Sequence, residues 1–279
     1  MIHHYFAPRI LHFALSSDWG DLMNVTYMNG AGNDFMVIDA RGLELDFSAM
    51  ALKLCKLSGA DGFMAVDTSE TVDFRLHFYN ADGSRGEMCG NGARCICRFA
   101  YDNGIAGENM TVQTDAGIVH GQRLSENQYR VRLNEPGVLD LNRKGDIAYL
   151  ELGNPGVPHA VLEVPGLRWE DKEALRQQGR ALRYDPAFPK GANVNMYTWI
   201  DESTIRILTY ERGVEDYTLA CGTGSASTVV VLWLKGLVKE RLTVENPGGT
   251  LTVTLSGSDG KVTELWLEGP TEIVKHYDI

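Results

Sequence analysis

The chain has 279 residues, of which 44% are hydrophobic and 23% charged, a composition typical of one large or two smaller globular domains. Its net charge of -11 argues against nucleic acid or an anionic membrane as the main partner. No apolar run approaches the roughly 18 residues of a membrane helix. The five cysteines of so long a chain favour reduced thiols over a disulfide framework.

The first 22 residues differ from the rest of the chain, and Met23 offers a second possible start. Arg9 is their only arginine or lysine, and no clear small-residue cleavage site follows, so a secretory signal is a poor interpretation. We expect residues 1–22 to be an N-terminal extension that is mobile or loosely packed.

Short segments with alternating or β-branched residues predict many strands. In chain order they are Val25–Tyr27, Phe35–Asp39, Val72–Tyr79, Thr111–Thr114, Tyr129–Leu133, Ala160–Val164, Thr204–Tyr210, Thr250–Leu255 and Thr263–Leu267. Helices are expected at Ser48–Leu57, Arg94–Tyr101, Glu170–Arg180 and Ala226–Leu234.

One motif occurs twice. Cys89 begins the segment Cys-Gly-Asn-Gly-Ala, and Cys221 begins Cys-Gly-Thr-Gly-Ser; each copy follows a strand and a polar loop and opens a predicted helix. The repetition predicts an α/β (α+β type) chain of two pseudo-symmetric halves, each a mainly antiparallel sheet wrapped on a central helix. We expect the halves at residues 23–136 and 137–267, with the active site at their interface.

The duplicated motif has a chemical meaning. A thiol at a helix N-terminus has a lowered pKa, and the glycines let backbone N–H groups approach a carboxylate. Two such thiols, facing each other, could invert an amino-acid α-carbon, since one takes the proton from one face and the other delivers a proton to the opposite face. Such a reaction needs no pyridoxal phosphate or other cofactor.

Other interpretations of the cysteines and glycines are weaker. Cys55 lies in an apolar helical pattern and is expected to be buried filler. Cys95 and Cys97 could suggest a metal with His159 or Cys221, but residues two apart point to different helix faces, so we expect no metal. The Gly-x-Gly turns lack the third glycine and the Gly-Lys-Ser/Thr ending of nucleotide loops.

The residues alone leave three further side chains open. His159 begins an apolar strand and could equally be a half-buried histidine with satisfied hydrogen bonds. Glu211 and Arg212 could be a simple surface pair, although a guanidinium fork would suit a carboxylate ligand.

An ordered set of segments resembles the diaminopimelate epimerase family. The segments are Met28–Phe35, Asn80–Ser84, Cys89–Cys95, Pro158–Val161, Tyr210–Gly213, Leu219–Gly224 and Pro247–Gly249. The resemblance covers nearly everything from Asn24 to the C-terminus. Related proline racemases usually carry histidine where this chain has Asn91, which favours the diaminopimelate branch.

The resemblance implies how the fold closes and what the protein does. The C-terminal segment, residues 268–279, would return to the first half. The activity would be interconversion of LL- and meso-diaminopimelate in lysine and peptidoglycan synthesis, by a cytoplasmic homodimer without a cofactor.

The resemblance also implies the site residues. Cys89 and Cys221 would be the acid/base pair, poised by His159 and Glu211. Residues that would hold the reacting α-carboxylate are Gly90, Asn91, Gly222 and Thr223. Residues that would read the rest of the substrate are Asn33, Asn80, Asn193, Glu211 and Arg212.

Three departures from the family pattern affect substrate detail. Val157 stands before Pro158-His159 where many members have asparagine, unless Asn154 replaces that amide. Tyr217 stands where glutamate is common, and Gly62 where a glutamine-type contact follows Asp61. The alternatives are a two-cysteine racemase for another amino acid, a same-fold isomerase, and a non-catalytic binding or redox-sensing protein.

Overall fold

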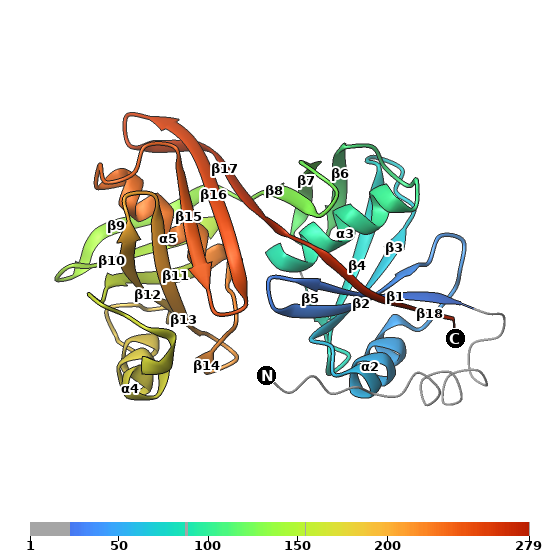
Figure 1. The fold of residues 1–279 in the computed structure, drawn as a ribbon, viewed down its shortest axis with the longest axis horizontal. Coiled ribbons are helices and arrows are strands. Elements are labelled where there is room, and N and C mark those ends of the chain that lie inside the picture. Colours follow the sequence, from blue (N-terminus) through green and yellow to red (C-terminus); the bar gives the residue numbers. More distant parts are fainter. Residues whose placement is uncertain (1–22, 87–88, 154, 279) are drawn as a thin grey trace. The chain divides into compact units, whose positions relative to one another are not determined.

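The computed structural model describes residues 23–86, 89–153 and 155–278 (Figure 1). The expectation for residues 1–22 lies outside this part of the chain. The chain forms two compact units: unit 1 comprises the described residues up to Asn127 and from Thr271 onward, and unit 2 runs from Gln128 to Pro270. Residues 128–132 lie in unit 2 because their strand pairs with Lys261–Pro270; the expected boundary, between 136 and 137, lies further along the chain.

Unit 1 is a mainly antiparallel sheet with two helices. Its elements are β1 (Asn24–Gly30), β2 (Asn33–Asp39), α2 (Phe47–Ser58), β3 (Gly62–Asp67), β4 (Phe74–Asn80), β5 (Arg85–Gly86), α3 (Gly90–Asp102), β6 (Asn109–Thr114), β7 (Gly117–Arg123) and β18 (Glu272–Asp278). The strand order is β18-β1-β2-β3-β4-β6-β7, with β5 paired to β4; only the β2–β3 and β4–β6 pairs are parallel.

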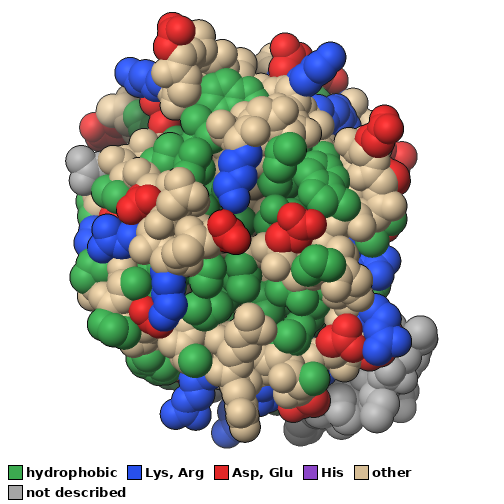
Figure 2. Space-filling model, turned by 90° about the vertical axis from the view of Figure 1, so that its left-hand side faces the viewer, with side chains coloured by type: hydrophobic (Ala, Val, Ile, Leu, Met, Phe, Trp, Pro, Cys, Tyr) green, Lys and Arg blue, Asp and Glu red, His purple; other side chains and the backbone are tan. Residues whose placement is uncertain are grey.

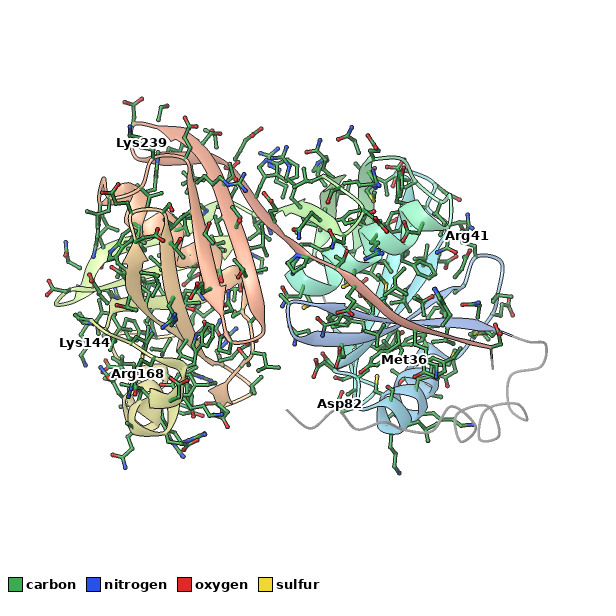
Figure 3. All side chains as sticks on the ribbon, viewed as in Figure 1. Met36, Arg41, Asp82, Lys144, Arg168 and Lys239 are labelled. Carbon is green, nitrogen blue, oxygen red and sulfur yellow. The ribbon has the colours of Figure 1, made fainter. Side chains whose placement is uncertain are left out.

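The sheet of unit 1 is covered on both faces, so the middle of β2 and nearly all of β3 are buried. In β2, Met36 and Ile38 pack with α2, and Figure 3 labels Met36 beside that helix. Phe35 points to the opposite face, where its ring lies 3.4 Å from the position that a Cβ on Gly92 of α3 would occupy. This two-sided burial explains why β2 reads as a continuous apolar run.

Unit 2 repeats this plan. Its elements are β8 (Gln128–Arg132), β9 (Pro136–Lys144), β10 (Ile147–Gly153), β11 (Gly156–Glu163), a 3₁₀ turn (Trp169–Asp171), α4 (Lys172–Arg183), β12 (Asn193–Asp201), β13 (Thr204–Glu211), β14 (Asp216–Tyr217), α5 (Gly222–Leu234), β15 (Arg241–Asn246), β16 (Gly249–Ser258) and β17 (Lys261–Pro270). The strand order is β9-β10-β11-β12-β13-β15-β16-β17-β8, and only the β11–β12 and β13–β15 pairs are parallel.

The two units share one order of connections. A hairpin (β1–β2 or β10–β11) leads through an outer helix (α2 or α4) to a parallel strand (β3 or β12) and a second hairpin. A short strand and the central helix (α3 or α5) then lead to another parallel strand. This repetition confirms the predicted α/β fold of two similar halves.

The described helices and surface add two observations on partners. No helix in the described ranges is long and apolar enough to cross a membrane. On the face that Figure 2 shows, lysine and arginine side chains are interspersed with acidic and hydrophobic ones. That face therefore carries no continuous basic surface of the kind that binds nucleic acid.

Candidate active site

Cys89 stands directly before α3, as the motif predicts. Its backbone is extended (φ -124°, ψ 124°), and its carbonyl accepts the first helical hydrogen bond from Ala93 N at 2.7 Å. The side chain is half-buried, so the thiol is held at the positive end of the helix while keeping access to a ligand.

An amide chain leads away from the start of α3. Asn91, which is 2% exposed, donates from Nδ2 to Asn33 Oδ1 at 2.6 Å, and Asn33 Nδ2 lies 3.3 Å from Asp61 Oδ2. Asn80 is exposed in the β4–β5 turn, where its Nδ2 donates to Ser84 Oγ at 3.0 Å. The structure thus connects Asn91 and Asn33, whereas Asn80 belongs to a separate turn network.

Cys221 holds the matching place before α5. Its backbone is also extended (φ -117°, ψ 107°), and its Sγ accepts a hydrogen bond from Gly224 N at 3.3 Å. Thr223 Oγ1 lies 3.5 Å from the same sulfur. The Gly224 N–H thus holds the thiol against the first turn of α5, and in the contact with Thr223 either the hydroxyl or the thiol can donate.

A buried polar chain lies beneath Cys221. Strands β11, β12 and β13 turn alternate residues toward α5, so that His159, Asn195 and Thr209 share one face. Asn195 Nδ2 is 3.2 Å from His159 Nδ1, and Thr209 Oγ1 donates to Asn195 Oδ1 at 3.0 Å. A Cβ on Gly224 would lie 2.2 Å from Asn195 Oδ1 and 3.2 Å from Cys221 Sγ, so the amide and the thiol converge on this glycine.

The ring of His159 is neutral in this setting. It is fully buried, and burial, followed by the nearby charge of Arg212, lowers its pKa to about 3. Because the Asn195 amide donates to Nδ1, we assign the ring proton to Nε2, which has no hydrogen-bond partner among the described residues. His159 therefore presents a neutral N–H donor.

The end of β13 gathers the remaining residues predicted for unit 2. Burial raises the pKa of Glu211, although Thr218 Oγ1 donates to its Oε2 at 2.9 Å. Asn193 Oδ1 accepts from the backbone N of Arg212 at 2.8 Å, and its Nδ2 donates to the Pro158 carbonyl at 3.2 Å. Asn193 thus fixes the backbone that carries Arg212.

The structure shows the surroundings of the three residues that depart from the family pattern. Gly62 is buried, and a Cβ there would lie 2.8 Å from the Phe78 ring, so no side chain fits without displacing Phe78. Tyr217 is half-buried and donates to the Leu175 carbonyl at 3.0 Å, which ties β14 to α4. Val157 is 38% exposed in β11, and Asn154 lies outside the described residues.

Two polar residues of these half-sites were missed in the sequence. Asn195 alternates with Asn193 in an otherwise apolar strand, a signal that both amides share a face. Arg94 interrupts a helix of small and apolar residues and is completely buried. A buried polar residue is the informative exception in such a segment.

The remaining cysteines of α3 point to different strands. A Cβ on Gly30 in β1 would lie 2.8 Å from Cys95 Sγ, and one on Gly121 in β7 would lie 2.3 Å from Cys97 Sγ. Among the described residues, no group of three or more His, Cys, Asp or Glu side chains could hold a metal ion.

The chain is similar to known epimerases along most of its length. A family model described as Diaminopimelate epimerase matches residues 25–137 and 152–274. The diaminopimelate epimerase of Aquifex aeolicus is 37% identical over 268 residues, covering 85% of this chain and 95% of that protein. The diaminopimelate epimerase of Archaeoglobus fulgidus is 35% identical over 260 residues, covering 85% and 91%.

Solved structures share the fold at low sequence identity. A phenazine biosynthesis protein of the PhzF family from Bacillus anthracis has a TM-score of 0.70 at 16% identity, covering 93% of this chain and 99% of that one. A hydroxyproline epimerase from Agrobacterium vitis has a TM-score of 0.67 at 16% identity, covering 95% and 92%. These likenesses establish the fold of two repeated halves.

Proposed function

The chain belongs to the diaminopimelate epimerase family, and on that premise we propose that it interconverts LL- and meso-diaminopimelate through Cys89 and Cys221. Family membership makes the protein an isomerase of the epimerase type. The observation that carries the two-thiol mechanism is the repetition of one arrangement: a cysteine with extended backbone directly before a buried central helix in each unit.

The proposed reaction is a balanced proton exchange. The thiolate of one cysteine removes the α-hydrogen as a proton and becomes a thiol, while the electron pair stays on the α-carbon. The thiol of the other cysteine delivers its proton to the opposite face and becomes a thiolate. The two thiols thus exchange protonation states, and no pyridoxal phosphate is needed.

Two helix N-termini would stabilise the negative charge that develops. The backbone N–H groups of Gly90 and Asn91, and of Gly222 and Thr223, are the donors we propose for the α-carboxylate. Charge moves from the α-carbon into that carboxylate as the proton leaves, so these donors act most strongly in the transition state.

His159 and Glu211 are proposed to poise the thiols in different ways. His159 is neutral, so its Nε2–H can donate to a thiolate without adding a positive charge. Burial raises the pKa of Glu211 and so favours its protonated form, in which the carboxyl group can donate a hydrogen bond to a thiolate.

The rest of the substrate is proposed to be read by polar residues of both units. Arg212 offers a fork of donors for the distal carboxylate, and Asn193 holds the backbone at that position. Asn33, Asn80 and Glu211 are proposed to contact the distant amino-acid centre. A racemase for another amino acid is the alternative. The substrate of such an enzyme would lack the distal carboxylate that Arg212 is proposed to bind.

The working form is proposed to be a cytoplasmic homodimer, as the family resemblance implies. Light scattering of the purified protein should give about twice the mass of the 30.8 kDa chain. A monomer that retains full specific activity on dilution would remove the dimer from this proposal.

The decisive experiment follows hydrogen exchange and epimer formation together. LL-diaminopimelate is incubated with reduced protein in D₂O without pyridoxal phosphate, and deuterium at the α-carbon is measured beside meso product. We expect Cys89→Ala and Cys221→Ala each to lower the epimerisation rate by at least about 1,000-fold, because each removes a proton-transfer group. Cys55→Ala is the matched control, since Cys55 is buried in α2 away from both motifs.

The outcomes separate the mechanism from the substrate. Epimerisation that survives in either motif variant would refute the two-thiol mechanism. Folded, reduced wild-type protein that exchanges no hydrogen would remove diaminopimelate as substrate, and a panel of other amino acids would then test the racemase alternative.

A further inference from the structure

Arg94 is the largest fully buried side chain in the described part of the chain, and no described carboxylate pairs with its charge. Its Nη1 reaches the Gly90 carbonyl at 3.4 Å, but Nε and Nη2 have no hydrogen-bond partner among the residues that the structure describes. A guanidinium stays protonated in proteins, and burying such a cation without an anion is costly. The surroundings of Arg94 are therefore suited to an anion.

The side chain of Arg94 points to the start of its helix. Helical side chains lean toward the N-terminus, and the contact with Gly90 places the guanidinium beside the residue that follows Cys89. Its positive charge adds to that of the helix N-terminus. An anion at this end of α3 thus gains from both.

Three thiols lie within electrostatic range of this guanidinium: Cys89, Cys95 and Cys97. Burial raises the pKa of Cys95 and Cys97 to about 12, so both remain protonated near neutral pH. Cys89 is half-buried and stands at the N-cap of the helix. Of the three, Cys89 is the thiol that can carry the negative charge.

Among the described residues, no charged group of the strands packed against α3 is paired with Arg94. Asp34 in β2 accepts a hydrogen bond from Asn29 at 2.7 Å, and Asp67 in β3 is paired with His77 at 3.2 Å. Arg98, one turn along α3, donates to Asp102 and to the Thr271 carbonyl. The titratable or charged groups on the strands packed against α3 are Tyr27, Asp34, Asp39, Asp67, His120 and Arg123.

In unit 2, no buried cation occurs among the described residues. The position five residues after Cys221 is Ala226. The side-chain polar groups near the start of α5 are neutral: the Asn195 amide, His159, and the hydroxyls of Thr209 and Thr223. Arg94 is the one arginine or lysine among the described residues that is buried. Arg212, whose charge acts on His159, is exposed, so a buried positive charge belongs to one half-site alone.

We propose that Arg94 is the fixed counter-charge of a Cys89 thiolate, so that Cys89 is the ionised thiol of the resting enzyme and Cys221 the protonated one. Arg94 is a positioning residue, since it acts through Cys89 and touches no substrate. This assignment deepens the proposed function, but the ionisation of a thiol is measurable without substrate, so the two can fail separately.

Alkylation against pH tests the assignment. Folded protein is treated with iodoacetamide over a range of pH, and modification of each cysteine is followed by peptide mass spectrometry. In Arg94→Met the midpoint for Cys89 should rise by at least about one pH unit, which makes alkylation about 10-fold slower well below the midpoint. The rate at high pH should stay equal or rise slightly, because a thiolate of higher pKa is more nucleophilic.

Matched variants separate charge from packing. Arg94→Lys keeps a cation, so the alkylation midpoint of Cys89 should stay close to the wild-type value. Arg94→Gln should raise that midpoint as Arg94→Met does. Arg98→Met removes a paired arginine of the same helix and should leave the Cys89 midpoint unchanged, and Cys221 in the Arg94→Met protein is an internal reference. An unchanged Cys89 midpoint in folded Arg94→Met, or an equal shift in Arg98→Met, would overturn the proposal.

A second measurement needs no change at Arg94. The ultraviolet thiolate absorbance of wild-type protein near neutral pH should be lost in Cys89→Ser and retained in Cys221→Ser. The opposite pattern, or no thiolate signal in the wild type, contradicts the assignment whether or not the enzyme turns over diaminopimelate.

Discussion

Single buried polar residues make the two half-sites chemically different. The helix of unit 1 starts over the cation of Arg94, and that of unit 2 starts beside the neutral imidazole of His159. Gly92 faces Met64 and Phe35, whereas Gly224 faces Asn195 and Thr209. A shared backbone plan therefore holds one thiol near a buried charge and the other near buried neutral dipoles.

The buried ring of His159 should make the free energy of unfolding depend on pH. Its pKa is about 3 in the folded protein, below the value of about 6.5 expected when unfolded. Between these values the unfolded chain binds a proton that the folded chain does not. The contribution of His159 to the free energy of unfolding is therefore fully present above about pH 6.5 and falls as the pH drops toward about 3. The expected loss is about 1.4 kcal/mol per pH unit.

A comparison of slopes isolates this residue from the carboxylates. Urea unfolding of wild type and His159→Gln is measured between about pH 4 and 6. The free energy of unfolding should fall less steeply with decreasing pH in the variant, by about 1.4 kcal/mol per pH unit. His120→Gln, at an exposed position of β7, should keep the wild-type slope. Equal slopes in wild type and His159→Gln would mean that the ring is not held neutral.

The sequence predicts Cys89 and Cys221 as the acid/base pair because a repeated motif is visible without a structure. It could not locate Asn195 or Arg94 as parts of the half-sites, because their significance comes from burial and from what they contact. His159 was open for the same reason: an imidazole in an apolar strand has no assigned role until its hydrogen-bond partner is known.

At the scale of elements, glycines set how closely each central helix packs. The first turn of α5 lies against the polar face of β12 and β13 only because residue 224 has no side chain. The equivalent turn of α3 is less tight, since a Cβ on Gly92 would meet Met64 Sδ at 3.2 Å. The start of α5 is therefore the less tolerant of the two.

Gly224→Ala should be destabilising because its methyl group would lie 2.2 Å from Asn195 Oδ1. We expect a loss of about 1–3 kcal/mol in the free energy of unfolding, together with lower kcat/KM as Asn195 and Cys221 shift. Gly107→Ala meets nothing within 4 Å and should be close to neutral. Urea titration and epimerase assays check both; a neutral Gly224→Ala would show that the turn relaxes freely.

Several of the expected strands lie wholly inside observed ones. The segment Thr204–Tyr210 lies within β13 and Thr250–Leu255 within β16. The strands β3 and β12 were missed because both their faces are buried in the middle of a sheet, which removes the alternation that a sequence displays. The expected strand at Val72–Tyr79 starts later, at Phe74, because Asp73 instead accepts hydrogen bonds from Thr111.

One helix start also differs from the expectation. The helix expected from Glu170 begins at Lys172, because residues 169–171 form a 3₁₀ turn in which Asp171 accepts from the backbone N of Arg168. Such local side-chain hydrogen bonds compete with helix formation. The sequence pattern therefore identified the element and missed its first turn.

At the scale of the molecule, unit 1 is completed by the end of the chain. Strand β18 pairs with β1 along almost its whole length, from Asn24 opposite Asp278 to Asn29 opposite Glu272. Without β18, β1 would become an edge strand with unpaired backbone groups. The integrity of unit 1 should therefore depend on the last few residues.

Removal of residues 272–279 should unfold or aggregate unit 1 more than unit 2. Hydrogen exchange with mass spectrometry should show protection lost in β1 and β2 while β12 and β13 stay protected. Val274→Thr, which changes an exposed side chain of β18 and keeps the strand, is the control and should exchange like wild type. Uniform loss of protection across both units would show that they unfold as one.

The pairing of β1 with β18 has a consequence for biosynthesis. Asn24 and Asp278 are 254 residues apart, and ribosomes add about 5–20 residues per second, so β1 emerges roughly 13–50 s before its partner strand exists. Unit 2 is continuous in the chain and can be complete first. During translation the edge of β1 therefore stays open to other nascent chains. A chaperone that shields this edge would be needed only during that interval.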